Sequence, residues 1–358
     1  MKTKLKKLFF IILGILIVGG FWCLISASNI VGRDKHGDSF YFVKDQAIKG
    51  LIIGVIVFFI LSKINIKLLR KFSFLFYIFN ILLLGMVFLP MFSPKGNISA
   101  NRWVEIFGVS FQPAELLKFT LILFIADFLS RRSPYELNNW KKTIVPLIVL
   151  VGIPMVLIFK QPATSIIVLF LIAVGAMCFA SKISLKTLLP IGVLVVALLG
   201  LSVLFGGNYR KARITHEDDY QKRQSITGIV RGGLSGVGFG QSIQKYNYLP
   251  QSYTDSIYAV IAEEFGFAGT ALVLTTYFFL CFCGFYIAMH TSDSFSSLFV
   301  IGTITWITVQ ALIHIMCMSI NYMPVTGLPL PLISYGGTSY AITLASLGVV
   351  YNVLKNKV

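Results

Sequence analysis

Asp255 is the residue of this sequence best placed for acid–base chemistry. It follows Pro250 and shortly precedes the apolar run Ile257–Ala262, so we expect its carboxylate to lie where water meets an apolar environment. Partial removal of water raises the pKa of a carboxylate and suits it to accept a proton as a general base. A structural alternative stays open, because Thr254 or Asp255 could instead cap the helix that follows.

The polar stretch before Asp255 also holds glycines and cations. Glycines are dense between Gly228 and Gly240, and Arg231 and Lys245 accompany them. Glycine lets a backbone approach a ligand closely, and arginine favours bidentate contact with phosphate. The same two cations could equally contact lipid headgroups. No strand–turn–helix pattern surrounds the glycines, so the sequence does not predict a dinucleotide site.

Other charged and aromatic residues have structural explanations beside functional ones. Glu115 and Lys118 are three residues apart, hence on one helical face, and ionisable groups inside a span usually pair or line a polar cavity. Structural pairing is therefore our default for them. Trp103 could be an interfacial belt residue, and Glu263 and Glu264 could be solvated charges at the interface.

Residues 323–339 contain three prolines within eight positions, which is incompatible with a regular helix. Irregular backbone at membrane depth survives only where it is buried in protein or lines a wet cavity. We therefore expect this segment to form a cavity wall.

Composition indicates an all-α polytopic membrane protein. Of the 358 residues, 56% are hydrophobic and 13% charged, whereas a soluble domain carries about 25% charged residues. The net charge of +17 fits lysines and arginines that flank membrane helices, so we do not expect nucleic-acid binding. We expect a single domain over residues 1–358.

Apolar runs predict about ten transmembrane helices. The expected spans are 8–28, 46–63, 73–92, 114–130, 143–159, 163–181, 187–205, 267–289, 296–317 and 335–354. Compact clusters of Lys and Arg with few acids favour a cytoplasmic location for both termini. This orientation places a large loop, about 206–265, outside the membrane between helices 7 and 8.

No motif for a cofactor is present in the sequence. There is no phosphate-binding G-x-x-x-x-G-K-[ST] pattern for ATP, and neither the four histidines nor the five cysteines have metal-ligand spacing. No cofactor or metal ligand is therefore assigned, although a divalent cation could bridge a diphosphate.

Several of these blocks occur together in one known family. In their order and spacing the chain resembles the SEDS family of bacterial cell-wall polymerases (FtsW, RodA and SpoVE). The matching blocks are Arg102-Trp103, 112–118, 220–221 with 224–225, 231–234, 244–245, 248–250, 254–255, 263–266, 324–331 and 334–339. The form of the glycine-rich block and of Pro324–Gly327 is closer to the FtsW/SpoVE branch. Ala163, Gln251, Ser256 and Tyr258 depart from the family pattern.

The resemblance implies a ten-span peptidoglycan glycosyltransferase that polymerises lipid II at the outer face of the bacterial cytoplasmic membrane. Its partners would be lipid II, the growing glycan strand, a class B penicillin-binding protein and other divisome or elongasome membrane proteins. The family's catalytic aspartate falls on Asp255. The residues we assign to substrate binding are Arg102, Trp103, Glu115, Lys118, Arg210, Arg231, Lys245 and Ser334. The alternatives are a lipid II flippase and a non-catalytic scaffold that activates a penicillin-binding protein.

Overall fold

The protein is predominantly helical. A computed structural model describes residues 2–92, 102–106, 109–161, 163–190, 192–193, 219–320, 323 and 325–356. The helices within these residues include α1 (Lys2–His36), α2 (Tyr41–Asp45), α3 (Ile53–Lys63), α4 (Ile66–Met86), α5 (Pro113–Ser130), α6 (Pro134–Leu137), α7 (Val145–Lys160), α8 (Thr164–Ala180), α11 (Asp219–Gly232), α12 (Ile257–Met289), α13 (Ser294–Ser319) and α14 (Gly337–Asn356). π-Helical turns at Gln46–Ile52 and Trp140–Ile144 lead into α3 and α7, and Pro90–Phe92 forms a 3₁₀ turn. The strands β1 (Val104–Ile106) and β2 (Val109–Phe111) pair antiparallel.

The apolar runs of the sequence form helices at the expected places. Among the described residues, seven helical segments are long and apolar enough to cross a membrane. They are Lys2–His36, Tyr41–Lys63, Ile66–Met86, Trp140–Lys160, Ile257–Met289, Ser294–Ser319 and Gly337–Asn356. The predominantly helical membrane architecture is thus confirmed. Most of the expected span 187–205 lies outside the described residues.

Helix α13 lies at the centre of the bundle. In its most apolar window 78% of the residues are buried, against 33% in α1. It packs against α5, α8, α12 and α14, while α3 packs against α14 and α4 against α5. Because α13 is enclosed on several sides, a polar side chain on it such as Gln310 forms its hydrogen bonds within the protein.

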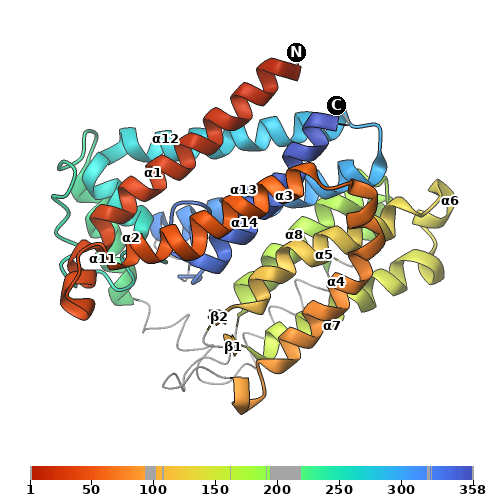
Figure 1. The fold of residues 1–358 in the computed structure, drawn as a ribbon, viewed down its shortest axis with the longest axis horizontal. Coiled ribbons are helices and arrows are strands. Elements are labelled where there is room, and N and C mark those ends of the chain that lie inside the picture. Colours follow the sequence, from red (N-terminus) through yellow and green to blue (C-terminus); the bar gives the residue numbers. More distant parts are fainter. Residues whose placement is uncertain are drawn as a thin grey trace.

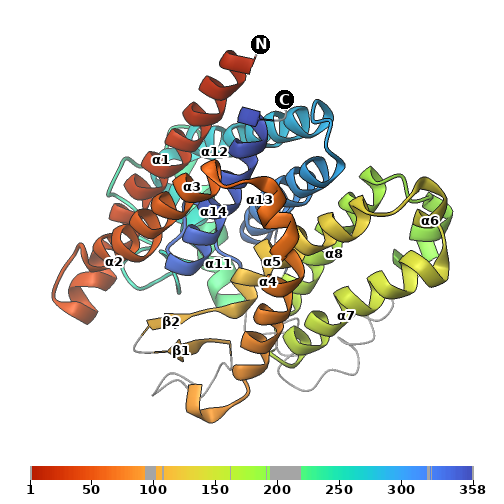
Figure 2. The ribbon, with the colours of Figure 1, turned by 45° about the vertical axis from the view of Figure 1, so that its right-hand side comes forward.

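The two ends of the bundle differ. Both termini lie at one end, whereas α2, α11 and the β1–β2 hairpin lie toward the other (Figures 1 and 2). We call these the terminal face and the loop face. The termini share one face, as the expected topology requires; the assignment of that face to the cytoplasm stays a prediction.

The long polar stretch is more ordered than its composition indicates. It contains α11, a series of turns over 233–256, and the first turns of α12. The expected eighth span began at residue 267, but α12 begins at Ile257 and continues through a kink at Gly266, whose φ is 61°. The boundary was misplaced because two glutamates interrupt the apolar run at the kink.

Candidate active site

Asp255 lies in a turn on the loop face, immediately before α12. Its side chain is partly exposed, whereas the following residues Ser256–Ala262 are buried. The N-cap of α12 is Ser256, whose side chain makes no capping hydrogen bond. Thr254 instead donates from Oγ1 to Oε1 of Gln251 at 2.9 Å. The structure thus places the N-cap of α12 at Ser256 and not at Thr254 or Asp255.

Helix α11 holds this turn from one side. Nε2 of Gln221 donates to Oγ of Ser256 at 2.7 Å and to the carbonyl of Pro250 at 3.3 Å. Oγ of Ser256 in turn donates to the same carbonyl at 3.0 Å. The side chain of Gln221 thus contacts both ends of the segment that contains Asp255.

The proline-rich segment holds the turn from a second side. Oγ of Ser334 donates to the carbonyl of Thr254 at 2.7 Å and accepts from the backbone N–H of Leu330 at 2.8 Å. The N–H of Tyr335 donates to the carbonyl of Tyr253 at 3.0 Å. The two peptide groups before Asp255 are therefore tied to the segment that the sequence predicts as a cavity wall.

Residues around the π-helical turn Gln46–Ile52 support the proline-rich segment from behind. Oη of Tyr335 donates to Oδ2 of Asp45 at 2.7 Å, and Nζ of Lys49 lies 2.6 Å from Oδ1 of the same carboxylate. The N–H of Gly336 donates to Oε1 of Gln46 at 2.9 Å. Burial, and then the bond to Asp45, raise the pKa of Tyr335, so its hydroxyl remains a donor at physiological pH.

An aromatic cluster completes the support of the turn. The ring of Tyr253 lies 4.3 Å from that of Phe42 and 5.7 Å from that of Tyr335, centroid to centroid. Burial, and then the charge of Asp255, raise the pKa of Tyr253. The aromatic cluster therefore adjoins Asp255 through Tyr253.

The glycine-rich run packs on the kink of α12 rather than forming an open cradle. A Cβ added at Gly232 would lie 1.9 Å from the carbonyl oxygen of Ala262, and one at Gly236 would lie 2.2 Å from that of Glu264. The N–H groups of Val237 and Gly238 donate to the carbonyls of Glu263 and Glu264, both at 3.0 Å. The glycines do allow a close approach, but the run approaches the backbone of α12 and not a ligand.

The kink at Gly266 interrupts the helical hydrogen bonds of α12, and the glycine-rich run supplies partners for the backbone groups left there. The N–H of Phe267 donates to the carbonyl of Gly233 at 2.9 Å, and that of Ala268 to the carbonyl of Leu234 at 3.4 Å. Buried backbone groups without partners are costly. The glycine-rich run therefore connects α11 to both halves of α12 through backbone hydrogen bonds.

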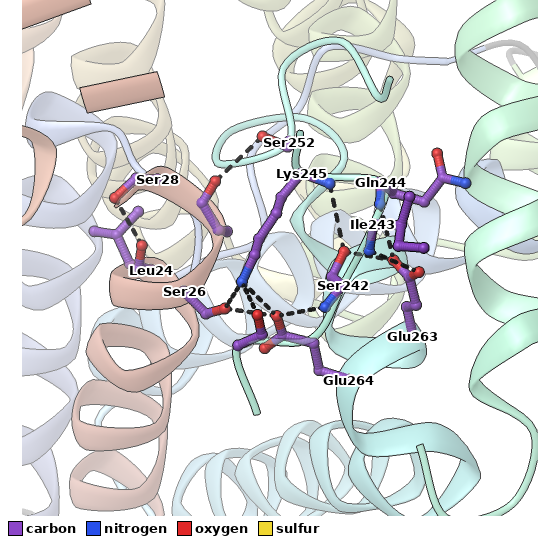
Figure 3. A network of polar contacts seen from close by, with 12 residues as sticks. Leu24, Ser26, Ser28, Ser242, Ile243, Gln244, Lys245, Ser252, Glu263 and Glu264 are labelled. Carbon is purple, nitrogen blue, oxygen red and sulfur yellow. Dashed lines mark hydrogen bonds and ion pairs between the residues drawn. The ribbon is translucent and has the colours of Figure 1, made fainter. Parts of the chain in front are cut away.

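Glu263 and Glu264 are buried, with 0% and 2% of their surface exposed, so the alternative of solvated interfacial charges is wrong. Figure 3 shows Ser26, Ser242 and Lys245 around them. Glu263 accepts from Nη1 of Arg231 at 2.7 Å, from the N–H of Ile243 at 3.0 Å and from the hydroxyl of Ser242. Both carboxylates are therefore held within the protein.

Lys245 is the buried partner of Glu264. Its Nζ donates to Oε1 of Glu264 at 3.1 Å, to Oγ of Ser26 at 2.9 Å and to the carbonyl of Gly240 at 2.7 Å (Figure 3). Its three N–H groups are thus used, and it is 1% exposed. The structure does not support the expected contact of Lys245 with a ligand, because the lysine joins α1 to the loop.

Glu115 and Lys118 form a second buried ion pair, as their spacing predicts. Nζ of Lys118 lies 2.8 Å from both carboxylate oxygens of Glu115 and 2.8 Å from Oε1 of Gln310 on α13. Nε2 of Gln310 donates to the carbonyl of Pro329 at 2.6 Å. The pair therefore connects α5 through α13 to the proline-rich segment.

Comparison with known proteins identifies the family. A family model described as "Cell cycle protein" and named for FtsW, RodA and SpoVE matches residues 6–358. The "Stage V sporulation protein E" of Bacillus subtilis (strain 168) is 33% identical over 98% of this chain and 97% of its own length. The chain belongs to the FtsW/RodA/SpoVE family.

Further relatives agree with this assignment. The "Probable peptidoglycan glycosyltransferase FtsW" of Nitrosomonas europaea is 32% identical over 95% of this chain and 90% of its own length. A solved chain described under "Structural coordination of polymerization and crosslinking by a peptidoglycan synthase complex" has a TM-score of 0.79 and 25% identity, covering 97% of both chains. The crystal structure of the Thermus thermophilus Rod shape determining protein RodA has a TM-score of 0.72 and 24% identity, covering 98% of this chain and 96% of that one. The predicted family is thus confirmed.

The predicted site residues of this FtsW/RodA/SpoVE chain fall into separate groups. Ser334 contacts the Asp255 turn directly, whereas Arg231 lies ten residues beyond Gln221 on α11, roughly 15 Å along the helix axis at 1.5 Å per residue. Arg231 and Lys245 therefore form a cluster apart from Asp255. Arg210 lies outside the described residues.

Two expected substrate contacts lie near the β1–β2 hairpin. Trp103 precedes β1 with 39% of its surface exposed. Arg102 donates from Nε to the carbonyl of Gln161 at 3.0 Å, next to the end of α7. Both residues lie on the loop face, so they are on the same side of the bundle as Asp255.

Three polar residues that support the site were missed from the sequence. Ser26 bonds Glu264, Gln310 bonds Lys118, and Asp45 bonds Tyr335. A polar residue inside an otherwise apolar span was the available signal for Ser26 and Gln310, since such groups must find partners. No comparable signal marked Asp45, because it lies beside other charged residues at the start of a span.

Proposed function

We propose that this chain is a peptidoglycan glycosyltransferase that polymerises lipid II at the outer face of the bacterial cytoplasmic membrane. The observation that carries the proposal is the presentation of Asp255. Its carboxylate is partly exposed in a turn that α11, the proline-rich segment and the residues around the π-helical turn hold in place. Membership of the family and the names of its relatives support the choice of substrate.

In this proposal Asp255 acts as the general base. It takes the proton from a sugar hydroxyl of the acceptor as that oxygen bonds to the anomeric carbon of the donor. The bond from the anomeric carbon to the diphosphate breaks, and undecaprenyl diphosphate leaves. The leaving diphosphate supplies the driving force, so the reaction does not require ATP.

The remaining predicted residues take two roles. Arg102, Trp103, Arg210 and Arg231 are the candidates for contact with the sugar or diphosphate. The Arg231 side chain is 39% exposed even though it pairs with Glu263, so one edge of its guanidinium group is available to a phosphate. Glu115, Lys118, Lys245 and Ser334 are buried, and we assign them to the positioning of the segments around Asp255.

We further propose that the loop face is extracellular and that a class B penicillin-binding protein supplies the transpeptidase activity. The solved chain with the highest similarity reported above belongs to a peptidoglycan synthase complex, which supports such a partner. Lipid II, the glycan strand and other divisome or elongasome proteins would meet the chain on this face.

The test is to incubate the purified protein with lipid II in detergent, with and without its partner transpeptidase. Glycan polymer with the wild type, and none with Asp255→Asn, supports the proposal. Asp38→Asn, which changes an exposed carboxylate in the α1–α2 turn, is the control and should retain activity. In liposomes, scrambling of lipid II without polymer would instead indicate a flippase, and neither activity would indicate a scaffold.

A further inference from the structure

A polar cavity lies on the terminal face, away from Asp255. It has a volume of about 430 Å³ and lies where the α3–α4 turn, the start of α13 and the end of α14 meet. The lining residues are Lys63, Ile64, Asn65, Ile66, Lys67, Arg70, Asp293, Phe295, Asn352 and Asn356. None of these residues takes part in the proposed glycosyl transfer.

The charges of the cavity are unbalanced. Three cations, Lys63, Lys67 and Arg70, line it together with one carboxylate, Asp293. Of these cations, Arg70 is paired with Asp127. In the part of the chain that the structure describes, neither lysine ammonium has an ion-pair partner within 4.0 Å. The cavity therefore carries positive charge that the described protein does not neutralise.

The walls of the cavity are fixed by the fold. Nε of Arg70 donates to Oδ1 of Asp127 at 2.8 Å, and its guanidinium carbon lies 5.7 Å from the ring centroid of Phe295. Nδ2 of Asn352 donates to the carbonyls of Leu61 and Ile64 at 2.8 and 2.7 Å. Arg70 and the α3–α4 turn are thus held in place without a ligand.

The cavity also receives the N-terminus of α4. Asn65 is the N-cap of this 21-residue helix and accepts from the N–H of Lys67. Free N–H groups and the helix dipole favour an anion at such an end. The helix end adds to the effect of the three side-chain cations, and the apolar side chains of Ile64, Ile66 and Phe295 stand beside them.

We propose that this cavity binds the phosphate group of an anionic ligand. Lys63 and Lys67 supply mobile charges, Arg70 supplies a fixed guanidinium group, and Asn356 supplies an amide at the rim. The ends of α3 and α4, which both belong to segments that can cross a membrane, place the cavity at the depth of lipid headgroups. An anionic phospholipid and a soluble phosphate offer the same chemistry to these residues.

The experiment measures the thermal unfolding of the purified full chain in neutral detergent, as phosphatidylglycerol or inorganic phosphate is added. The cavity variant is Lys63→Ala/Lys67→Ala. The matched control is Lys141→Ala/Lys186→Ala, which removes two exposed lysines that do not line the cavity. Phosphatidylcholine controls for the lipid chains, and the unfolding midpoint without ligand checks that each variant folds.

We expect a saturable stabilisation by phosphatidylglycerol whose midpoint concentration rises about tenfold or more in the cavity variant, since each surface lysine contributes appreciably to binding of an anionic lipid. The control should match the wild type, and Asp293→Asn should bind more tightly because the single carboxylate of the cavity is removed. The same variant pattern with inorganic phosphate alone would identify a soluble phosphate as the ligand. Equal weakening in both double variants, or no response to either anion, would overturn the proposal.

Discussion

Asp255 and the pair Glu263–Glu264 lie on one continuous stretch of chain, yet their surroundings differ in kind. The two glutamates are almost completely buried and accept hydrogen bonds from several side-chain and backbone donors. Asp255 is partly exposed, and its position is fixed through the peptide groups on either side of it. Carboxylates enclosed by donors stabilise a fold, whereas a carboxylate presented by a rigid turn can accept a proton from a substrate.

Lys245→Ala should have the largest effect on stability. Removing the ammonium group leaves the carboxylate of Glu264 buried without its cation, and breaking a buried ion pair costs about 3–5 kcal/mol. We expect a large drop in the thermal unfolding midpoint in detergent, and a partial recovery when Glu264→Gln is added. Lys44→Ala removes an exposed ion pair with Asp38 and should leave the midpoint unchanged. Equal midpoints for the two lysine variants would refute the structural role of Lys245.

Gly266→Ala should have the next largest effect on stability, because it disrupts the packing of the glycine-rich run on the kink of α12. The backbone at Gly266 (φ 61°, ψ −155°) lies in a region that is essentially restricted to glycine, which costs another residue about 1–3 kcal/mol. Overpacking adds about 1–3 kcal/mol, since the new Cβ would lie 2.4 Å from the nitrogen of Gly236. Gly240→Ala is the control, because its φ is also positive but no atom lies within 4 Å of the added Cβ. If the two glycine variants unfold at the same temperature, the packing of the glycine-rich run on the kink does not contribute to the stability of the protein.

Tyr335→Phe should destabilise the protein less than Gly266→Ala does. Its loss of activity should be larger than its loss of stability alone would cause. The lost bond to the carboxylate of Asp45 costs about 1.5 kcal/mol, at the low end for a charged partner, because Lys49 still pairs with that carboxylate. Since Tyr335 supports the Asp255 turn, we expect polymerisation to slow by about tenfold, a misplacement effect. Tyr351→Phe, whose ring packs on Phe9 and Phe10, should keep its rate. Normal polymerisation by Tyr335→Phe would show that this support is not needed.

The sequence predicted the spans well because a membrane helix is marked by the length of an apolar run. It also predicted the pairing of Glu115 with Lys118, which depends only on helical spacing. Helix α11 was not predicted, because a polar helix held by neighbouring segments has no apolar run of its own. The bond between Ser26 and Glu264 joins residues 238 positions apart, and no local pattern encodes such a contact.

The same reasoning explains the errors in the loop. Glycines in the run after α11 are compatible with contact to a ligand or to a backbone, and only the position of α12 distinguishes the two. Likewise, a lysine beside a glycine-rich run is consistent with phosphate binding until its three donors are seen to be used by Ser26, Gly240 and Glu264. Burial decides between these roles, and burial in this loop depends on tertiary contacts.

The most direct test of the account is the rate of glycan polymerisation by Asp255→Asn, measured per folded molecule with lipid II. Because the side chain is partly exposed, we expect the unfolding midpoint of this variant to stay close to that of the wild type, with a stability change within about 0.5 kcal/mol. Removal of a general base should slow polymerisation by about 100-fold or more. A folded Asp255→Asn protein that polymerises lipid II at the wild-type rate would contradict the central role of Asp255.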